Sequence, residues 1–191
     1  MSRALTRAMR SPATDHDLWR GAAAGALGGI VGSSAMVVFN HLLAATGFGR
    51  SDRGGRKPER RDDAKPNDTD GTIADEPASM KAASNLAEAV TGQPLGERGK
   101  KIGGPIMHHA FGAAVGALYG AAAAGVPQVT AGGGMPYGAF VWLAGAEAGV
   151  PLSGLSRSPD SYPPARHAAS LATHLVFGAT VEATRRWMTR R

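Results

Sequence analysis

Long uncharged stretches alternate with short charged segments along this 191-residue chain. Residues 21–49 contain no Asp, Glu, Lys or Arg, and residues 102–146 contain none either. A helix that crosses a bilayer needs about 20 mainly apolar residues, so the second stretch is long enough for two helices and a turn. The pattern predicts an all-α, polytopic membrane protein with four transmembrane helices, at about 18–48, 102–125, 135–153 and 167–186.

Polar and aromatic residues mark the ends of these predicted helices. A polar basic tail, residues 1–17, leads to Trp19 and Arg20, an aromatic and a cation typical of a membrane interface. Glycines at 132–134 predict a tight reversal between the second and third helices, and residues 188–191 form a second basic tail. Basic residues before an apolar segment also occur in cleaved signal peptides, but this apolar run exceeds the 7–15 residues of a signal core. It therefore favours an uncleaved anchor.

A polar insert separates the first predicted span from the second. Residues 50–101 carry eleven Lys and Arg and ten Asp and Glu, with few large apolar side chains in the first half. This composition predicts a partly disordered segment. Within it, residues 78–90 place apolar side chains on one stripe, which predicts a short amphipathic helix. The same pattern fits a helix on the membrane surface and a helix in a soluble loop.

The overall composition leaves a soluble alternative open. The net charge is +6 and the pI about 10.2, which is typical of nucleic-acid-binding proteins. The uncharged stretches are rich in Ala and Gly, which insert into membranes only weakly. A soluble, basic helical protein that binds nucleic acid is therefore one alternative. Because the insert is a balanced polyampholyte and not a basic arm, we expect the lipid bilayer, and no nucleic acid, as partner.

An internal repeat relates two of the predicted helices. Residues 108–115 align without gaps on residues 174–181 and match at His, Phe, Gly, Ala and Val. The repeat predicts two helical hairpins related by a pseudo-twofold axis along the membrane normal. Small residues at four-residue spacing let helices approach closely in a bilayer. We therefore expect close helix packing at the glycines of the second and fourth spans: Gly112, Gly116, Gly120 and Gly178.

Four polar residues inside the predicted spans form a candidate intramembrane cluster: His108, Glu147, His174 and Glu182. An ionised carboxylate at the centre of a membrane costs about 2.5–3.5 kcal/mol, so each such residue needs a partner or a function. Glu147 near two histidines would exchange protons in the neutral range. Alternatively, Glu147 lies near a helix end and only stabilises helix packing. Glu182 stands four residues before Arg186, which predicts an ion pair.

Known chemical motifs are absent from the sequence. There is no cysteine, phosphate-binding loop, dinucleotide-binding fingerprint, nucleophile elbow or zinc-protease helix. The spacing of the His and Glu residues matches no metal motif. We expect no enzymatic activity, with no catalytic residues, cofactor or metal.

Motifs in the second half of the chain resemble the YagU-like (DUF1440) family of small bacterial inner-membrane proteins. They are His108 and Phe111 followed by Tyr119-Gly120, the segment 151–156 that closes the third span, and His174-Leu175-Val176 leading to Glu182 and Arg185-Arg186. The resemblance implies a multi-pass protein of the bacterial inner membrane without established catalytic residues.

Three functions agree with these observations. The first is a structural or accessory membrane protein of the cell envelope, acting as a homo-oligomer or with other membrane proteins. The second is a small oligomeric transporter or proton-conducting protein that uses the intramembrane His and Glu residues. The third is the soluble nucleic-acid-binding protein. Four spans place both termini on one side, and the positive-inside rule favours the cytoplasm.

Overall fold

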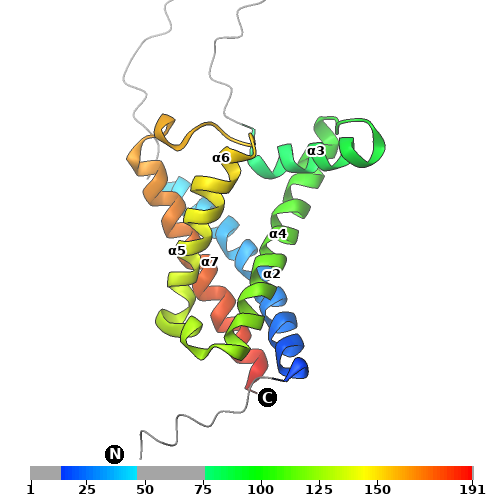
Figure 1. The fold of residues 1–191 in the computed structure, drawn as a ribbon. Helices are drawn as coiled ribbons and strands as arrows, with labels where there is room; N and C mark the ends of the chain where they lie inside the picture. Colours follow the sequence, from blue (N-terminus) through cyan, green and yellow to red (C-terminus); the bar gives the residue numbers. More distant parts are fainter. Residues whose placement is uncertain (1–13, 47–75, 191) are drawn as a thin grey trace, which may run out of the picture.

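The computed structural model describes residues 14–46 and 76–190, and these residues fold into helices without strands. Four long helical segments run along one bundle, and a shorter helix lies across one of its ends (Figure 1). The predicted all-α class is therefore confirmed. The first described helix begins, and the last one ends, at the same end of this bundle.

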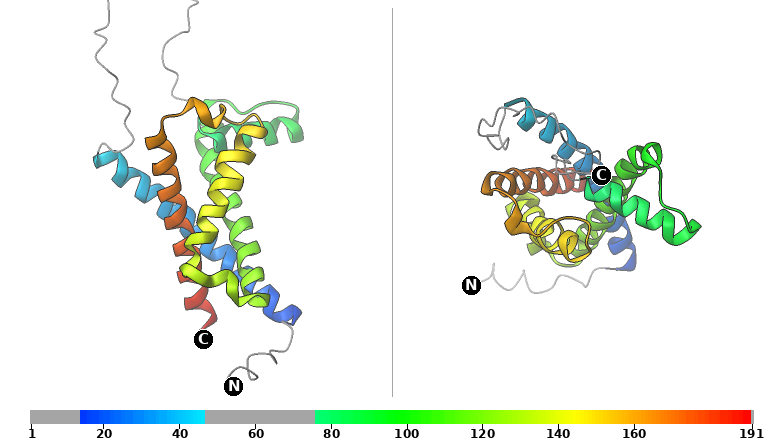
Figure 2. Two further views of the ribbon diagram at one scale, coloured as in Figure 1. Left: turned by 60° about the vertical axis from the view of Figure 1, so that its left-hand side comes forward. Right: turned by 90° about the horizontal axis from the view of Figure 1, so that it is seen from above.

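The first helix, α2, spans Asp15–Thr46 and crosses the other helices obliquely (Figure 2). It begins three residues before the predicted span because Thr14 and Asp17 form reciprocal capping bonds. The Thr14 hydroxyl donates to Asp17 over 2.7 Å, and the Asp17 amide donates to Thr14 Oγ1 over 3.3 Å. The basic tail predicted at 1–17 thus ends in a helix turn, and its residues 1–13 lie outside the described part.

The predicted amphipathic helix is present as α3, Ala78–Thr91. Gly92 ends it in a left-handed conformation, with φ of 75°. It packs against the start of the next helix, where Gly104 lies against Met80. Half of the insert predicted to be partly disordered, residues 50–75, lies outside the described residues, as do residues 47–49 before it.

The second long helix, α4, spans Glu97–Gly125 and begins before the apolar stretch. The charged residues at 97–101 continue the helix because Glu, Arg and Lys are good helix formers and Glu97 suits an N-terminal turn. The reversal predicted after it is the segment η1, Pro127–Gly134. Its last three glycines have φ of 68°, 66° and 84°, values that favour glycine.

The third helical segment is divided and the fourth is continuous. An α-helix, α5 (Met135–Val141), continues into the π-helix η2 (Trp142–Gly149) and the short α6 (Val150–Leu152). The π-helix was not predicted. After the turn η3 (Pro159–Ser161), α7 spans Pro164–Thr189, so it includes part of the predicted C-terminal tail.

Glycines form the contact between α2 and α4. Gly21, Gly25 and Gly29 of α2 lie against Gly120, Gly116 and Gly112 of α4, in antiparallel order. A Cβ atom at any of these positions would collide with backbone of the other helix. The two backbones therefore touch directly, as small residues at this spacing predict.

The second hairpin, α5 with α7, repeats this arrangement. Gly178, the repeat equivalent of Gly112, lies against Gly134 at the end of η1 and Gly138 of α5. α2 also packs against α7, since Gly28 faces Val181 and Gly32 faces Phe177. The buried apolar core is small and centres on four side chains: Met36, Tyr119, Phe177 and Val181.

Among the helices of residues 14–46 and 76–190, α2 alone is long and apolar enough, by length and composition, to count as a candidate membrane span. The α, π and α segments of the third helix are each too short when taken singly. The long helices α4 and α7 include more polar and small residues. The described residues thus form an all-helical bundle with one candidate membrane span, and the four predicted spans are not confirmed.

Candidate functional site

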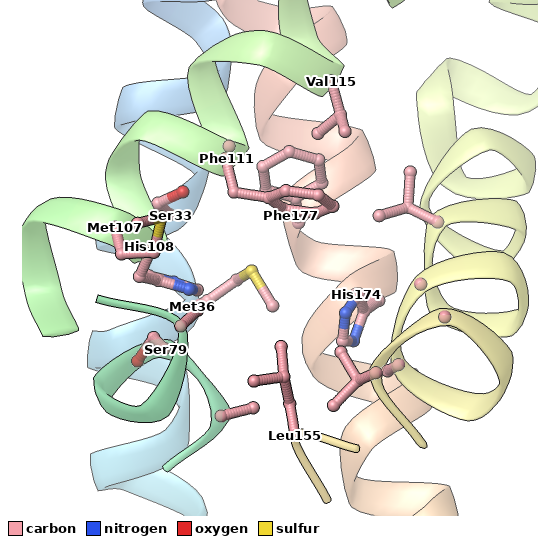
Figure 3. Close-up of a pocket in the computed structure, with 18 of the residues that line it drawn as sticks. Ser33, Met36, Ser79, Met107, His108, Phe111, Val115, Leu155, His174 and Phe177 are labelled. Atoms are coloured by element: carbon pink, nitrogen blue, oxygen red, sulfur yellow. The ribbon is translucent and has the colours of Figure 1, made fainter. Parts of the chain in front are cut away.

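An apolar cavity of about 560 Å³ lies between α2, α4, η2 and α7, with α3 at one end (Figure 3). Phe111, Val115 and Phe177 line its inner end, whereas Ser79 and Leu155 line the end near α3. Its volume is within the 300–1,000 Å³ typical of small-molecule sites. This cavity is therefore a candidate binding site.

Two of the four predicted polar residues, His108 and His174, share this cavity wall. His174 Nδ1 lies 2.8 Å from the Ser170 carbonyl oxygen. A carbonyl only accepts hydrogen bonds, so Nδ1 carries the proton and Nε2 of the neutral ring is an acceptor. The repeat in the sequence therefore brings its two histidines to one place, although they come from different hairpins.

The cavity wall also includes an unpaired hydroxyl group and a glycine with open space beside it. Ser33 is 1% exposed, lines the cavity and leaves its hydroxyl without a hydrogen-bond partner. Gly145 of the π-helix has no atom within 4 Å of the position where a Cβ would stand. Wide π-turns occur frequently at functional sites. Gly145 thus lines the cavity without contacting another helix, in contrast to the glycines that lie between helices.

A smaller polar pocket of about 240 Å³ adjoins the cavity and shares Ala78, Ala146 and Val150 with it. Glu147 lines this pocket and pairs with His167, whose Nδ1 lies 2.9 Å from the carboxylate. His167 Nε2 lies 3.0 Å from the Pro159 carbonyl. Because both ring nitrogens face acceptors, the geometry fits a protonated imidazole.

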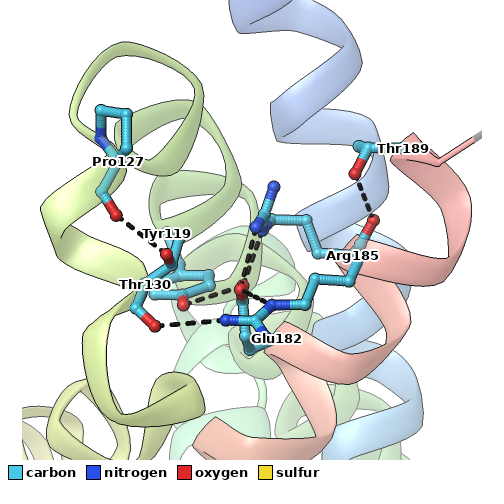
Figure 4. Close-up of polar contacts among 7 residues, drawn as sticks. Tyr119, Pro127, Thr130, Glu182, Arg185 and Thr189 are labelled. Atoms are coloured by element: carbon cyan, nitrogen blue, oxygen red, sulfur yellow. Dashed lines mark hydrogen bonds and ion pairs between the residues drawn. The ribbon is translucent and has the colours of Figure 1, made fainter. Parts of the chain in front are cut away.

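Glu182, the fourth predicted residue, lies in a separate network near the C-terminal end of α7 (Figure 4). Arg185 Nε and Nη2 bind its carboxylate over 2.7 and 2.9 Å, and the predicted pair with Arg186 is present. The Tyr119 hydroxyl donates to Glu182 over 2.9 Å. Glu182 is 1% exposed, so two guanidinium groups and a hydroxyl compensate a buried carboxylate.

The structure thus divides the predicted polar cluster among three places. His108 and His174 meet at the cavity, Glu147 lies in the adjacent pocket, and Glu182 belongs to the arginine network. Eight helical residues, or about 12 Å, separate His174 from Glu182 along α7. Described residues hold no group of three or more His, Cys, Asp or Glu positioned to bind a metal.

Sequence reasoning missed several partners. Tyr119 comes from a helix 63 residues away from Glu182, and no local pattern links the two. Arg185 stands three residues after Glu182, a spacing that also allows an ion pair and so was a usable signal. Asn40, which the sequence places near the end of the first span, accepts a 2.8 Å hydrogen bond from Thr173 and joins α2 to α7.

Fold and site together define the class: an all-helical protein of glycine-packed hairpins around an apolar cavity. Residues 93–183, just under half of the chain, match the model of DUF1440, described as a protein family of unknown function. The matched segment, which holds α4, the divided helix and most of α7, is therefore similar to the DUF1440 family, consistent with the resemblance of its motifs. Neither the curated proteins nor the solved structures include a match to the chain.

Proposed function

We propose that the chain is an integral membrane protein of the bacterial envelope with four spans and a structural or accessory role. The observation that carries this proposal is the distribution of large apolar side chains. Many face outward, including Val38 at 59%, Leu118 at 70% and Phe140 at 63% exposure, while glycines, Tyr119 and Glu182 lie inside. A surface of this kind suits a lipid environment.

Helix lengths and charge positions support the same proposal. At 1.5 Å per residue, α2, α4 and α7 are about 48, 44 and 39 Å long, and Met135–Leu152 is about 27 Å long. The hydrocarbon core of a bilayer is about 30 Å thick. Charged residues gather at the two ends of the bundle, with Arg20 and Arg185 at one end and Lys100 and Arg166 at the other.

Carbonate washing tests the membrane location. Membranes from expressing cells are washed with alkaline carbonate and then extracted with detergent. An integral protein stays with the membrane until detergent is added. Release by carbonate would overturn the proposal and leave a soluble or peripheral bundle, including the nucleic-acid-binding alternative.

Single cysteines distinguish four spans from one, since the chain has no native cysteine. Gln128→Cys lies in the reversal between α4 and α5, and Ser158→Cys lies in the loop before α7; both positions are exposed. With four spans, a membrane-impermeant maleimide added to spheroplasts labels only one of the two. If α2 alone crosses the membrane, both cysteines lie on the same side and react alike.

A proton-conducting role receives less support from the geometry. It requires a continuous polar path, but Glu147 is paired with His167 and Glu182 with Arg185 and Arg186. Only His108 and His174 share a cavity, and its other walls are mainly apolar. The structural or accessory role therefore stands as the proposal.

A further inference from the structure

We propose that the cavity and the adjoining polar pocket form one binding site for an amphiphile with an acyl chain and an anionic head. The chain would occupy the apolar cavity, and the head would lie in the polar pocket. This inference goes beyond the structural role and does not depend on the number of spans.

The two hollows form one site because they have common walls. Ala78, Ala146 and Val150 line both. One hollow is lined mainly by apolar side chains, whereas the other combines charged groups, including Glu147, Arg166 and His167, with proline and alanine side chains. A ligand that fills both must therefore be apolar at one end and polar at the other.

The dimensions of the cavity suit one acyl chain. Its lining along α4 runs from Met107 to Val115, which is about 12 Å of helix. Half of a bilayer's hydrocarbon core is about 15 Å thick, the depth that a chain of one leaflet spans. Side chains at the inner end, including Val115, Val141 and Phe177, offer apolar contacts without charge.

Charge complementarity identifies the head as an anion. Two carboxylates line the polar pocket, and each already has a cationic partner: Glu147 pairs with His167, and Glu76 lies 3.1 Å from Lys100. Arg166 adds a further positive charge to the same walls. The Arg166 guanidinium is held 3.8 Å above the ring of Tyr162, so it is positioned without a carboxylate. The pocket therefore has an excess of positive charge suited to a carboxylate or phosphate.

Native mass spectrometry of the full chain in nonionic detergent tests the site, with oleate as probe. We expect one oleate to bind saturably. Gly145→Phe adds a ring at a residue that lines the cavity, where a Cβ has open space, and should weaken binding at least tenfold. Ala148→Phe is the matched control, since Ala148 is exposed on the same π-helix and lines neither hollow. If Gly145→Phe does not fold, Ala144→Phe replaces it, because Ala144 also lines the cavity.

The head is tested with a neutral analogue. The wild-type chain should prefer oleate to oleyl alcohol, and Arg166→Gln should abolish that preference. Arg190→Gln, at the opposite end of α7, is the matched control and should keep it. An equal preference in the wild type and Arg166→Gln overturns the assignment of the anionic head.

Competing lipids distinguish the source of the amphiphile. Displacement of bound oleate by phosphatidylglycerol but not by phosphatidylcholine identifies an anionic phospholipid, with one chain in the cavity. Retention of oleate against both identifies a free fatty acid. Equal oleate binding by Gly145→Phe and Ala148→Phe, or no saturable binding, overturns the proposal. These outcomes are measured on purified protein, so they are independent of the carbonate and maleimide experiments.

Discussion

Replacing Gly116 with Ala should separate α2 from α4. A methyl group at this position would lie 2.9 Å from the Gly29 Cα and closer still to the Gly25 carbonyl oxygen. Ordinary van der Waals contact begins at 3.4 Å, so the backbones must move apart by at least 0.5 Å. Overpacking of this kind costs about 1–3 kcal/mol. Since the neighbouring atoms belong to rigid helix backbone, no side chain can turn away to relieve it.

Helix propensity acts in the opposite direction and must be separated from the steric effect. Replacing a glycine inside a helix with alanine gains about 0.5–1 kcal/mol. Gly145→Ala provides the matched control, because it gains the same propensity and its methyl group meets no atom within 4 Å. The difference between the two variants is therefore the steric cost alone, about 1–3 kcal/mol.

The assay is the loss of helical circular dichroism when detergent-solubilised protein is titrated with sodium dodecyl sulfate. Gly116→Ala should unfold at a lower denaturant fraction than the wild type, and Gly145→Ala at an equal or higher one. Equal stability of the two variants would show that α2 and α4 do not pack through their glycines, and would refute the reasoning.

Three further predictions concern polar groups at the end of the bundle where α2 begins and α7 ends. Glu182→Gln should lower the free energy of unfolding by about 3–5 kcal/mol in the same titration, because two arginines lose a buried carboxylate. Tyr119→Phe should cost only about 0.5–1.5 kcal/mol, the net value of one hydrogen bond, and a loss as large as that of Glu182→Gln would contradict this. The hydrogen bond from the Thr14 hydroxyl lowers the pKa of Asp17 below its ordinary 3.8 in the folded chain. The cap therefore stabilises α2 fully above pH 3.8, and this stabilisation is lost as the pH falls through the lowered pKa of the folded state. Amide exchange in the first turn of α2 should accelerate at acid pH in the wild type but show no such change in Asp17→Asn.

Much of the helical framework could be predicted because local signals determine it. The uncharged stretches located the long helices, and the glycines at 132–134 located the reversal, since positive φ angles favour glycine. The pair between Glu182 and Arg186 followed from helical spacing alone. The predicted ends of the helices were less accurate. Charged residues such as those at 97–101 extend a helix beyond its apolar part, and hydropathy does not register them.

The site depends on contacts that no local pattern encodes. Tyr119 meets Glu182 only through the packing of α4 on α7. The π-helix at 142–149 inserts one extra residue per turn, and its sequence of small residues reads equally well as an α-helix. Consequently the cavity beside Gly145 was not predicted, although its two histidines were identified as candidates.

The cavity arises where the two hairpins depart from their symmetry. In a symmetric pair, the contact between α2 and α7 would recur between α4 and the divided third helix. The α2–α7 contact is tightly packed, with Gly28 against Val181 and Gly32 against Phe177. Between α4 and the divided third helix, in contrast, the π-helix and α4 line opposite walls of the cavity (Figure 3). The repeat thus explains the scaffold, whereas the π-helix, which has no counterpart in α2, explains why one side of the bundle has room for a ligand.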